Sequence, residues 1–106
     1  MIFSLDEVLQ RLPLPATAKW PDGVWDIEVL RSTRLLLEAF APRGEDHQSP
    51  HDRDEVYVIV RGRAVFVDKK SRQACGPGDA LFVAAESYHH FEEMTDDFAT
   101  WVIFAG

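Results

Sequence analysis

Apolar and polar residues alternate with a period of two over much of the chain after residue 24. Trp25, Ile27 and Val29 alternate with acidic residues, which is typical of a strand with one buried face. Further strands are expected at residues 34–41, 55–61, 63–68, 72–75, 80–83, 89–92 and 98–105. Because Gly, Pro and Asp separate these short segments, the pattern predicts an all-β sandwich or barrel.

The first residues have a helical pattern instead. Ser4 and Glu7 have the spacing of a capping box, which satisfies backbone groups at the start of a helix. Apolar residues follow at helical spacing, namely Leu5, Val8, Leu9 and Leu12. Pro13 cannot continue a helix, so we expect a short N-terminal helix that ends before it.

Two of the expected strands are apolar on both faces. If Glu55 points into the interior, Tyr57 and Ile59 point the same way, because side chains alternate along a strand. The outer face then carries Val56, Val58 and Val60. Residues 98–105 show the same two-sided pattern. A short helix covers only part of such a surface, so we expect a homodimer to bury the rest.

Length and charge restrict the possible partners. A chain of 106 residues is expected to form a single domain, residues 1–106. The formal charge of −7 disfavours nucleic acid and anionic membrane surfaces as partners. The single cysteine, Cys75, fits a reducing cytoplasm. A secretory signal and a membrane-spanning run are not expected from the pattern, so we predict a cytoplasmic location.

Residues 44–62 concentrate the side chains that bind divalent metals. His47 and His51 lie here, together with the acidic residues Glu45, Asp46, Asp52, Asp54 and Glu55. On one straight strand His51 and Glu55 would be about 13 Å apart, at about 3.3 Å per residue. Both can bind one ion only if the chain bends at residues 52–54, where turn-forming aspartates lie. The segment therefore suggests a metal site at a bend before a strand.

The same residues resemble the motifs of a known family. The first motif of the cupin superfamily reads G-x5-H-x-H-x3,4-E-x6-G, and its second half matches His51, Glu55 and Gly62 in spacing. The second motif, G-x5-P-x-G-x2-H-x3-N, aligns with Gly78 and His89. The chain thus resembles a small single-domain cupin. This resemblance implies a jelly-roll β-barrel (a double-stranded β-helix) and a metal held by His51, Glu55 and His89.

The fourth metal ligand is left open, because Ser49 stands where the family has its first histidine. His47 can take that place if the chain bulges; otherwise Gln48, Ser49 or water completes the coordination. His89 and His90 are adjacent on an expected strand, so only one of them points inward. The motif spacing selects His89.

Two histidines and one carboxylate with open positions suit Fe(II), and Mn, Ni or Zn would also fit. Tyr57, Phe82 and Phe91 are candidates for the wall of a ligand site. Such residues are more often part of a core, but in a small barrel the two roles overlap. The resemblance implies dioxygenase, isomerase, epimerase or cyclase activity. We expect a metal-dependent enzyme, of the oxygenase or isomerase type, that acts on a small organic molecule. The alternatives are a non-catalytic cupin that binds or senses a small molecule, and a cupin that has lost its metal.

Overall fold

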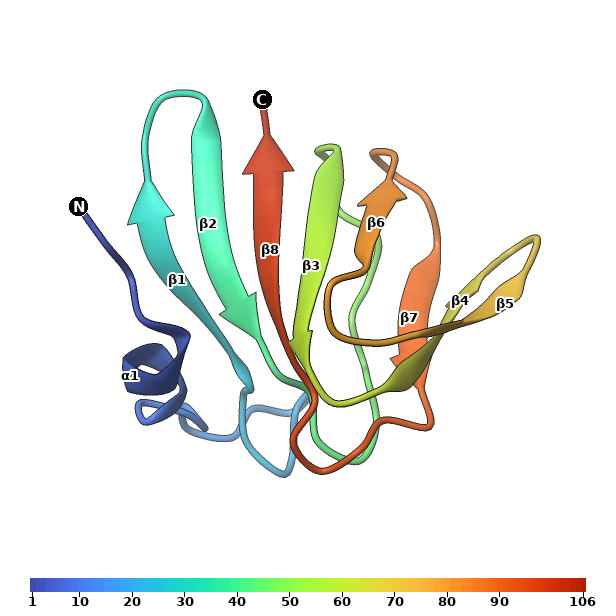
Figure 1. The fold of residues 1–106 in the computed structure, drawn as a ribbon, viewed down its shortest axis with the longest axis horizontal. Coiled ribbons are helices and arrows are strands. Elements are labelled where there is room, and N and C mark those ends of the chain that lie inside the picture. Colours follow the sequence, from blue (N-terminus) through green and yellow to red (C-terminus); the bar gives the residue numbers. More distant parts are fainter.

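Two antiparallel sheets and one short helix make up the computed structural model, which describes residues 1–106 (Figure 1). The elements are α1 (Leu5–Leu9), β1 (Asp26–Arg31), β2 (Leu35–Phe40), β3 (Glu55–Arg61), β4 (Ala64–Asp68), β5 (Arg72–Cys75), β6 (Ala80–Val83), β7 (His89–Glu92) and β8 (Ala99–Ala105). The larger sheet has the order β1-β2-β8-β3-β6, and the smaller sheet has the order β5-β4-β7. The predicted all-β class with an N-terminal helix is confirmed.

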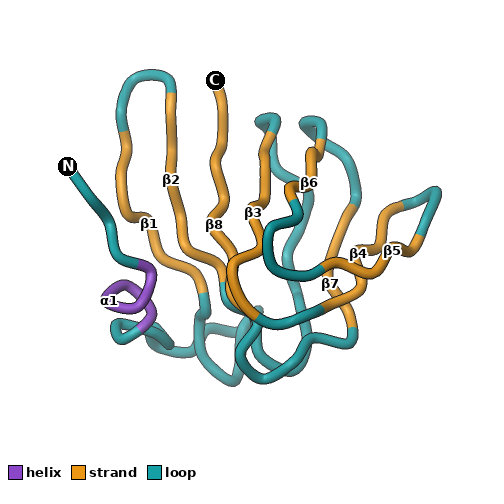
Figure 2. Tube along the Cα trace, in the orientation of Figure 1, coloured by secondary structure: helices purple, strands orange, loops and turns teal.

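The path of the chain between the sheets gives the jelly-roll arrangement. The chain leaves the larger sheet after β3 and again after β6, and it returns with β6 and with β8 (Figure 2). As a result β8 lies between β2 and β3, although it is the last strand in sequence. These crossings bring the start of β3 in one sheet close to the start of β7 in the other.

The core lies between the two sheets. Tyr57 and Ile59 of β3 pack in one cluster with Phe66 of β4 and Phe91 of β7. Glu55, Tyr57 and Ile59 are each only 1% exposed, which confirms the inward face predicted for β3. The side chain at the inner face of this strand therefore changes from a carboxylate at its start to an aliphatic group near its end.

The glycine that closes the first motif sits where two segments meet. Gly62 has a φ of 72°, in the left-handed region that favours glycine. A Cβ atom at this position would lie 2.7 Å from the Cα atom of Phe98. Gly62 thus permits both the turn after β3 and the close approach of the segment that leads into β8.

The helix α1 covers one part of the outer face of the larger sheet. Ser4 caps it by accepting a hydrogen bond from the Glu7 N–H at 3.4 Å. Leu5 and Val8 pack on buried alanines of β2 and β8, and Trp101 packs at the edge of this cluster. No helix here combines the length and the apolar character that crossing a bilayer requires.

Candidate metal centre

Three predicted ligands meet at one end of the interior. His51 comes from the loop before β3, Glu55 begins β3, and His89 begins β7. One ligand atom from each lies within 4.8 Å of the others. The Nε2 atom of His89 is 2.8 Å from Glu55 Oε1, and the Nε2 atom of His51 is 4.0 Å from Glu55 Oε2. A single ion can therefore be reached by all three side chains.

The bend that this cluster requires is present at residues 52 and 53. The loop after β6 holds it in place. The His51 carbonyl accepts a hydrogen bond from the Glu86 N–H at 2.7 Å, and the Asp54 carboxylate accepts one from the Ala85 N–H at 2.9 Å. Glu86, which stands where the cupin motif has glycine, has a φ of 66°. The loop thus keeps the glycine-like conformation without the glycine, and it leads directly into His89.

A hydrogen bond from the Nδ1 atom of His89 sets the orientation of its ring. Nδ1 lies 2.9 Å from the Ser87 carbonyl oxygen, to which it donates. In the neutral ring Nε2 then carries a lone pair that faces Glu55. Burial opposes protonation, but the Glu55 contact and the Ser87 carbonyl outweigh it, so the pKa of His89 is raised above its ordinary value. Either a proton or a cation is thus favoured between His89 and Glu55.

Tyr57 presents a further lone pair at the same place. The Gln48 side-chain amide donates to the Asp46 carboxylate, so its carbonyl oxygen is left to accept from the Tyr57 hydroxyl at 2.8 Å. With its proton engaged there, the Tyr57 oxygen faces His89 Nε2 at 3.0 Å as an acceptor. Burial, then the charges of Glu55 and Asp46, raise the pKa of Tyr57 well above its ordinary value.

The lone pairs and the negative charge that meet in this cluster fit a divalent cation. Both oxygens of Glu55 are buried without a hydrogen-bond donor, and its contact with His89 is an ion pair only when the ring is protonated. A buried carboxylate without a partner is costly. Neutral imidazole and carboxylate are the ligand types that Fe, Mn, Ni and Zn accept, and the His89–Ser87 hydrogen bond is the kind of outer contact that orients such a ligand.

The structure does not bring His47 into this cluster. Its side chain is 37% exposed, with Nε2 3.7 Å from Glu45. Its ring packs edge-on against Trp20, 5.3 Å away between centroids. The reason is that the hydrogen bonds between Gln48 and Asp46 direct Gln48 toward the interior, so the neighbouring His47 faces outward.

Of the other predicted site residues, some lie at the cluster and some lie elsewhere. Tyr57 is at the cluster, whereas Phe91, 1% exposed, belongs to the aromatic core. Phe82 is 66% exposed and pairs in register with Val56, which puts it on the outer face of the sheet and away from the site. Ser49 accepts a hydrogen bond from Lys19 at 2.7 Å. His90 faces Glu92 at 2.6 Å and not the cluster, as the strand parity predicted.

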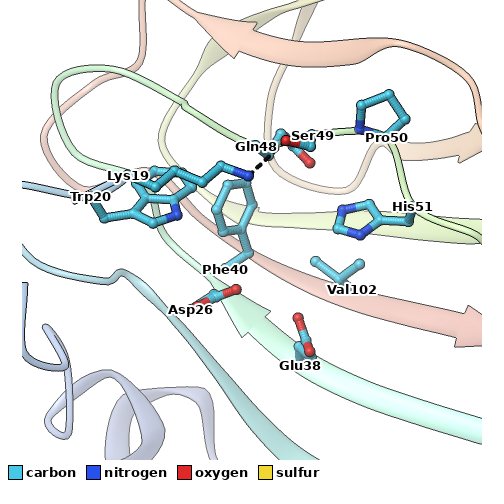
Figure 3. Close-up of a pocket in the computed structure, with 10 residues that line it drawn as sticks. All are labelled: Lys19, Trp20, Asp26, Glu38, Phe40, Gln48, Ser49, Pro50, His51 and Val102. Atoms are coloured by element: carbon cyan, nitrogen blue, oxygen red, sulfur yellow. Dashed lines mark hydrogen bonds between the residues drawn. The ribbon is translucent and has the colours of Figure 1, made fainter. Parts of the chain in front are cut away.

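A cavity of about 200 Å³ lies beside the cluster and shares His51 with it (Figure 3). Asp26 of β1 and Glu38 of β2 also line it, and neither residue was expected there from the sequence. Burial, reinforced by the charges of Asp26, Glu28 and Glu55, raises the pKa of Glu38 to about 7. Burial also raises the pKa of Asp26.

Comparisons with known proteins agree with this fold. No family model matches the chain. An uncharacterised protein of Streptomyces coelicolor is 30% identical over 105 residues, which is 97% of this chain and 93% of that protein. A cupin-2 domain protein from Shewanella frigidimarina superposes with a TM-score of 0.71 at 11% identity, over 99% of this chain and 95% of the other. The chain has the fold of the cupins.

Two further solved structures resemble this chain. KdgF from Halomonas sp. has a TM-score of 0.66 at 18% identity, over 76% of this chain and 77% of that chain. The DMSP lyase DddQ from Ruegeria pomeroyi has a TM-score of 0.63 at 25% identity, over 71% of this chain but only 40% of the lyase chain. A shared fold of this kind supports many chemistries, so the reaction must be argued from the site itself.

Proposed function

We propose that this protein is a metal-dependent enzyme that acts on a small organic molecule in the cavity beside His51, Glu55 and His89. The observation that carries the proposal is the buried Glu55 carboxylate, which has no donor and faces two imidazole nitrogens. Fe(II), Mn, Ni and Zn all suit this ligand set. Because His51 both lines the cavity and belongs to the cluster, a molecule in the cavity lies next to the metal position.

The residues of the cavity favour proton-transfer chemistry, as in an isomerase. A bound divalent ion would act as a Lewis acid on an oxygen of the substrate. Glu38 has a pKa of about 7, so its carboxyl group exchanges a proton readily at neutral pH, as a general acid or base must. Trp20, Phe40 and Val102 form the apolar part of the wall and limit the entry of water. The same ligand set serves oxygen-activating enzymes, and it is Glu38 that favours proton transfer here.

Hydrogen–deuterium exchange tests the proposal without a known product. The metal-loaded protein is incubated in D₂O with small hydroxy, keto and amino acids and followed by proton NMR. We expect one compound to lose the signal of a C–H next to its carbonyl or to be converted. Chelation, His89→Ala and Glu38→Gln should each stop the reaction, whereas the control His90→Ala should not.

Other outcomes of this experiment support the alternatives. A compound that shifts the protein's signals but neither exchanges nor reacts would favour a binding or sensing protein. Metal-dependent consumption of O₂ with one of the compounds would favour an oxygenase. Exchange that persists after chelation would contradict a metal-dependent reaction.

We also propose a homodimer that covers the outer face of the larger sheet. Val56 and Val58 are only half-buried there, and Phe82 is 66% exposed beside them. A two-fold contact is the commonest way to bury such a surface. Sedimentation at micromolar concentration should give twice the chain mass of 12.1 kDa, and Phe82→Ser should shift the protein toward monomer. A wild-type monomer would contradict the proposal.

A further inference from the structure

Two carboxylates share the cavity without an ion-pair partner. Asp26 is paired with Phe40 across β1 and β2, and Glu38 is paired with Glu28, so all four side chains lie on the inner face of the sheet. Like charges directly opposite each other destabilise a strand pair. Glu28 is exposed and forms an ion pair with Arg31 at 2.7 Å. No such cation contacts Asp26 or Glu38, and both carboxyl groups have raised pKa values.

Aromatic rings form the wall next to these carboxylates. Trp20 and Phe40 meet edge to face, with 6.4 Å between ring centroids, and both line the cavity. Figure 3 shows the Phe40 ring between the carboxylates and the loop that carries Gln48 and Ser49. Aromatic faces attract cations, and the attraction increases where water is excluded. The cavity thus combines the two kinds of group that recognise a positively charged organic ligand.

Lys19 is the one basic side chain of the cavity wall apart from His51. Its ammonium group donates to the Ser49 hydroxyl at 2.7 Å, and Figure 3 shows this hydrogen bond on the side opposite Asp26 and Glu38. Lys19 therefore holds the loop over the cavity. Its charge and that of His51 act on Asp26, but neither forms an ion pair with Asp26 or Glu38.

We infer that this cavity binds the positively charged head group of a small organic molecule, such as an ammonium or other onium group, with Asp26 and Glu38 as its counter-ions. The volume of about 200 Å³ is below the roughly 300–1,000 Å³ of most ligand pockets, so the molecule is small. An oxygen at its other end would reach the metal position beside His51. That second contact rests on the proposed function, whereas the cation contact rests on the cavity alone.

Cation binding is coupled to the ionisation of Glu38. Asp26 and Glu28 on β1, together with Glu55 on β3, disfavour the charged form of Glu38, and only Arg31 favours it. A bound cation offsets this repulsion and so favours the ionised form of Glu38. The apparent affinity should therefore increase as the pH rises through about 7.

Matched ligand pairs test the inference, using choline against the neutral 3,3-dimethylbutanol and ethanolamine against propanol. Titration calorimetry on the full chain should show at least one cation binding about tenfold more tightly than its neutral partner, which corresponds to about 1.4 kcal/mol. Glu38→Gln and Asp26→Asn should each remove most of this preference. Glu28→Gln is the control and should retain it, because that carboxylate is already paired with Arg31.

The inference and the proposed function can fail separately. Equal affinity for the charged and neutral partners, no binding of either cation, or an unchanged preference in both Glu38→Gln and Asp26→Asn would overturn the cation site. Thermal melting of each variant checks that it is folded. Cation selectivity in a protein that takes up no metal would refute the proposed function and leave the cation site standing. Metal uptake without cation selectivity would refute the cation site and leave the proposed function standing.

Discussion

The two ends of the space between the sheets are built for different purposes. At one end Ile59, Phe91 and Phe98 pack as a core of aromatic and aliphatic side chains. At the other end Glu55 and His89 are just as buried, at 1% exposure, but Glu55 has no donor for either oxygen. Apolar burial stabilises a fold, whereas a buried carboxylate destabilises it unless a proton on His89 or a cation offsets its charge. The apolar end therefore maintains the fold, whereas the polar end carries a cluster that could hold a metal ion.

The largest expected effect is at the apolar end. Phe98 is fully buried and its ring lies 5.0 Å from that of Phe91. Phe98→Ala should lower the free energy of unfolding by about 3–5 kcal/mol, measured by urea denaturation. The metal affinity of the folded variant should stay within about twofold of the wild type, because distant sites are nearly additive. A loss of metal affinity well beyond twofold in the folded Phe98→Ala variant would show that the two ends are not independent.

At the polar end the largest effect should come from the metal. At 100 times its Kd a ligand raises the free energy of unfolding by about 2.7 kcal/mol. Chelation should therefore lower the melting temperature by roughly 4–8 °C per kcal/mol lost. Glu55→Gln removes a ligand, so its melting temperature should not respond to metal or to chelator. An equal change of melting temperature on chelation in the wild type and in Glu55→Gln would contradict a metal site at Glu55.

A smaller effect is expected from Glu38. Its folded pKa of about 7 is above the ordinary value of 4.5, so the protonated form is favoured by folding. This stability is fully present below about pH 4.5 and is lost as the pH rises through about 7. Because the group is partly exposed, Glu38→Gln should raise the free energy of unfolding at pH 8 by only about 1–2 kcal/mol. An unchanged pH profile in this variant, measured by denaturation from pH 4 to pH 8, would contradict the assignment.

Much of the fold was predictable because its signals are local. The strands at residues 55–61, 72–75, 80–83 and 89–92 have the bounds expected from alternation and turn residues. The bend before Glu55 followed from the distance that a straight strand would impose. His89 was separated from His90 by strand parity and motif spacing. These inferences need only neighbouring residues and standard backbone geometry.

The parts that escaped prediction depend on contacts between distant segments. Apolar Ile27 and Val29 pack outward with the helix cluster, while Asp26 faces the cavity. Alternation cannot reveal this, because both faces of the sheet are covered in that region. A signal was available, since Glu28 of β1 and Glu38 of β2 lie opposite one another. This pairing can be recognised only once the register of the two strands is known.

His47 and Phe82 illustrate the same limit. The direction of His47 is set by hydrogen bonds of Asp46, one of which comes from the backbone of Phe91 at 2.8 Å. Residue composition near His51 contains no information on that long-range contact. Phe82 was expected in the core or in the wall of a ligand site, but its register with Val56 places it on the outer face of the sheet.

Metal content measured together with anomalous diffraction tests the central claim most directly. The protein and its variants are loaded with Fe, Mn, Ni or Zn, desalted, and analysed for bound ions. We predict one ion per chain, bound by His51, Glu55 and His89, in the wild type, in His90→Ala and in His47→Ala. His51→Ala, Glu55→Gln and His89→Ala should lose it. A wild type that takes up none of these metals, or a loss in His90→Ala equal to that in His89→Ala, would contradict the account.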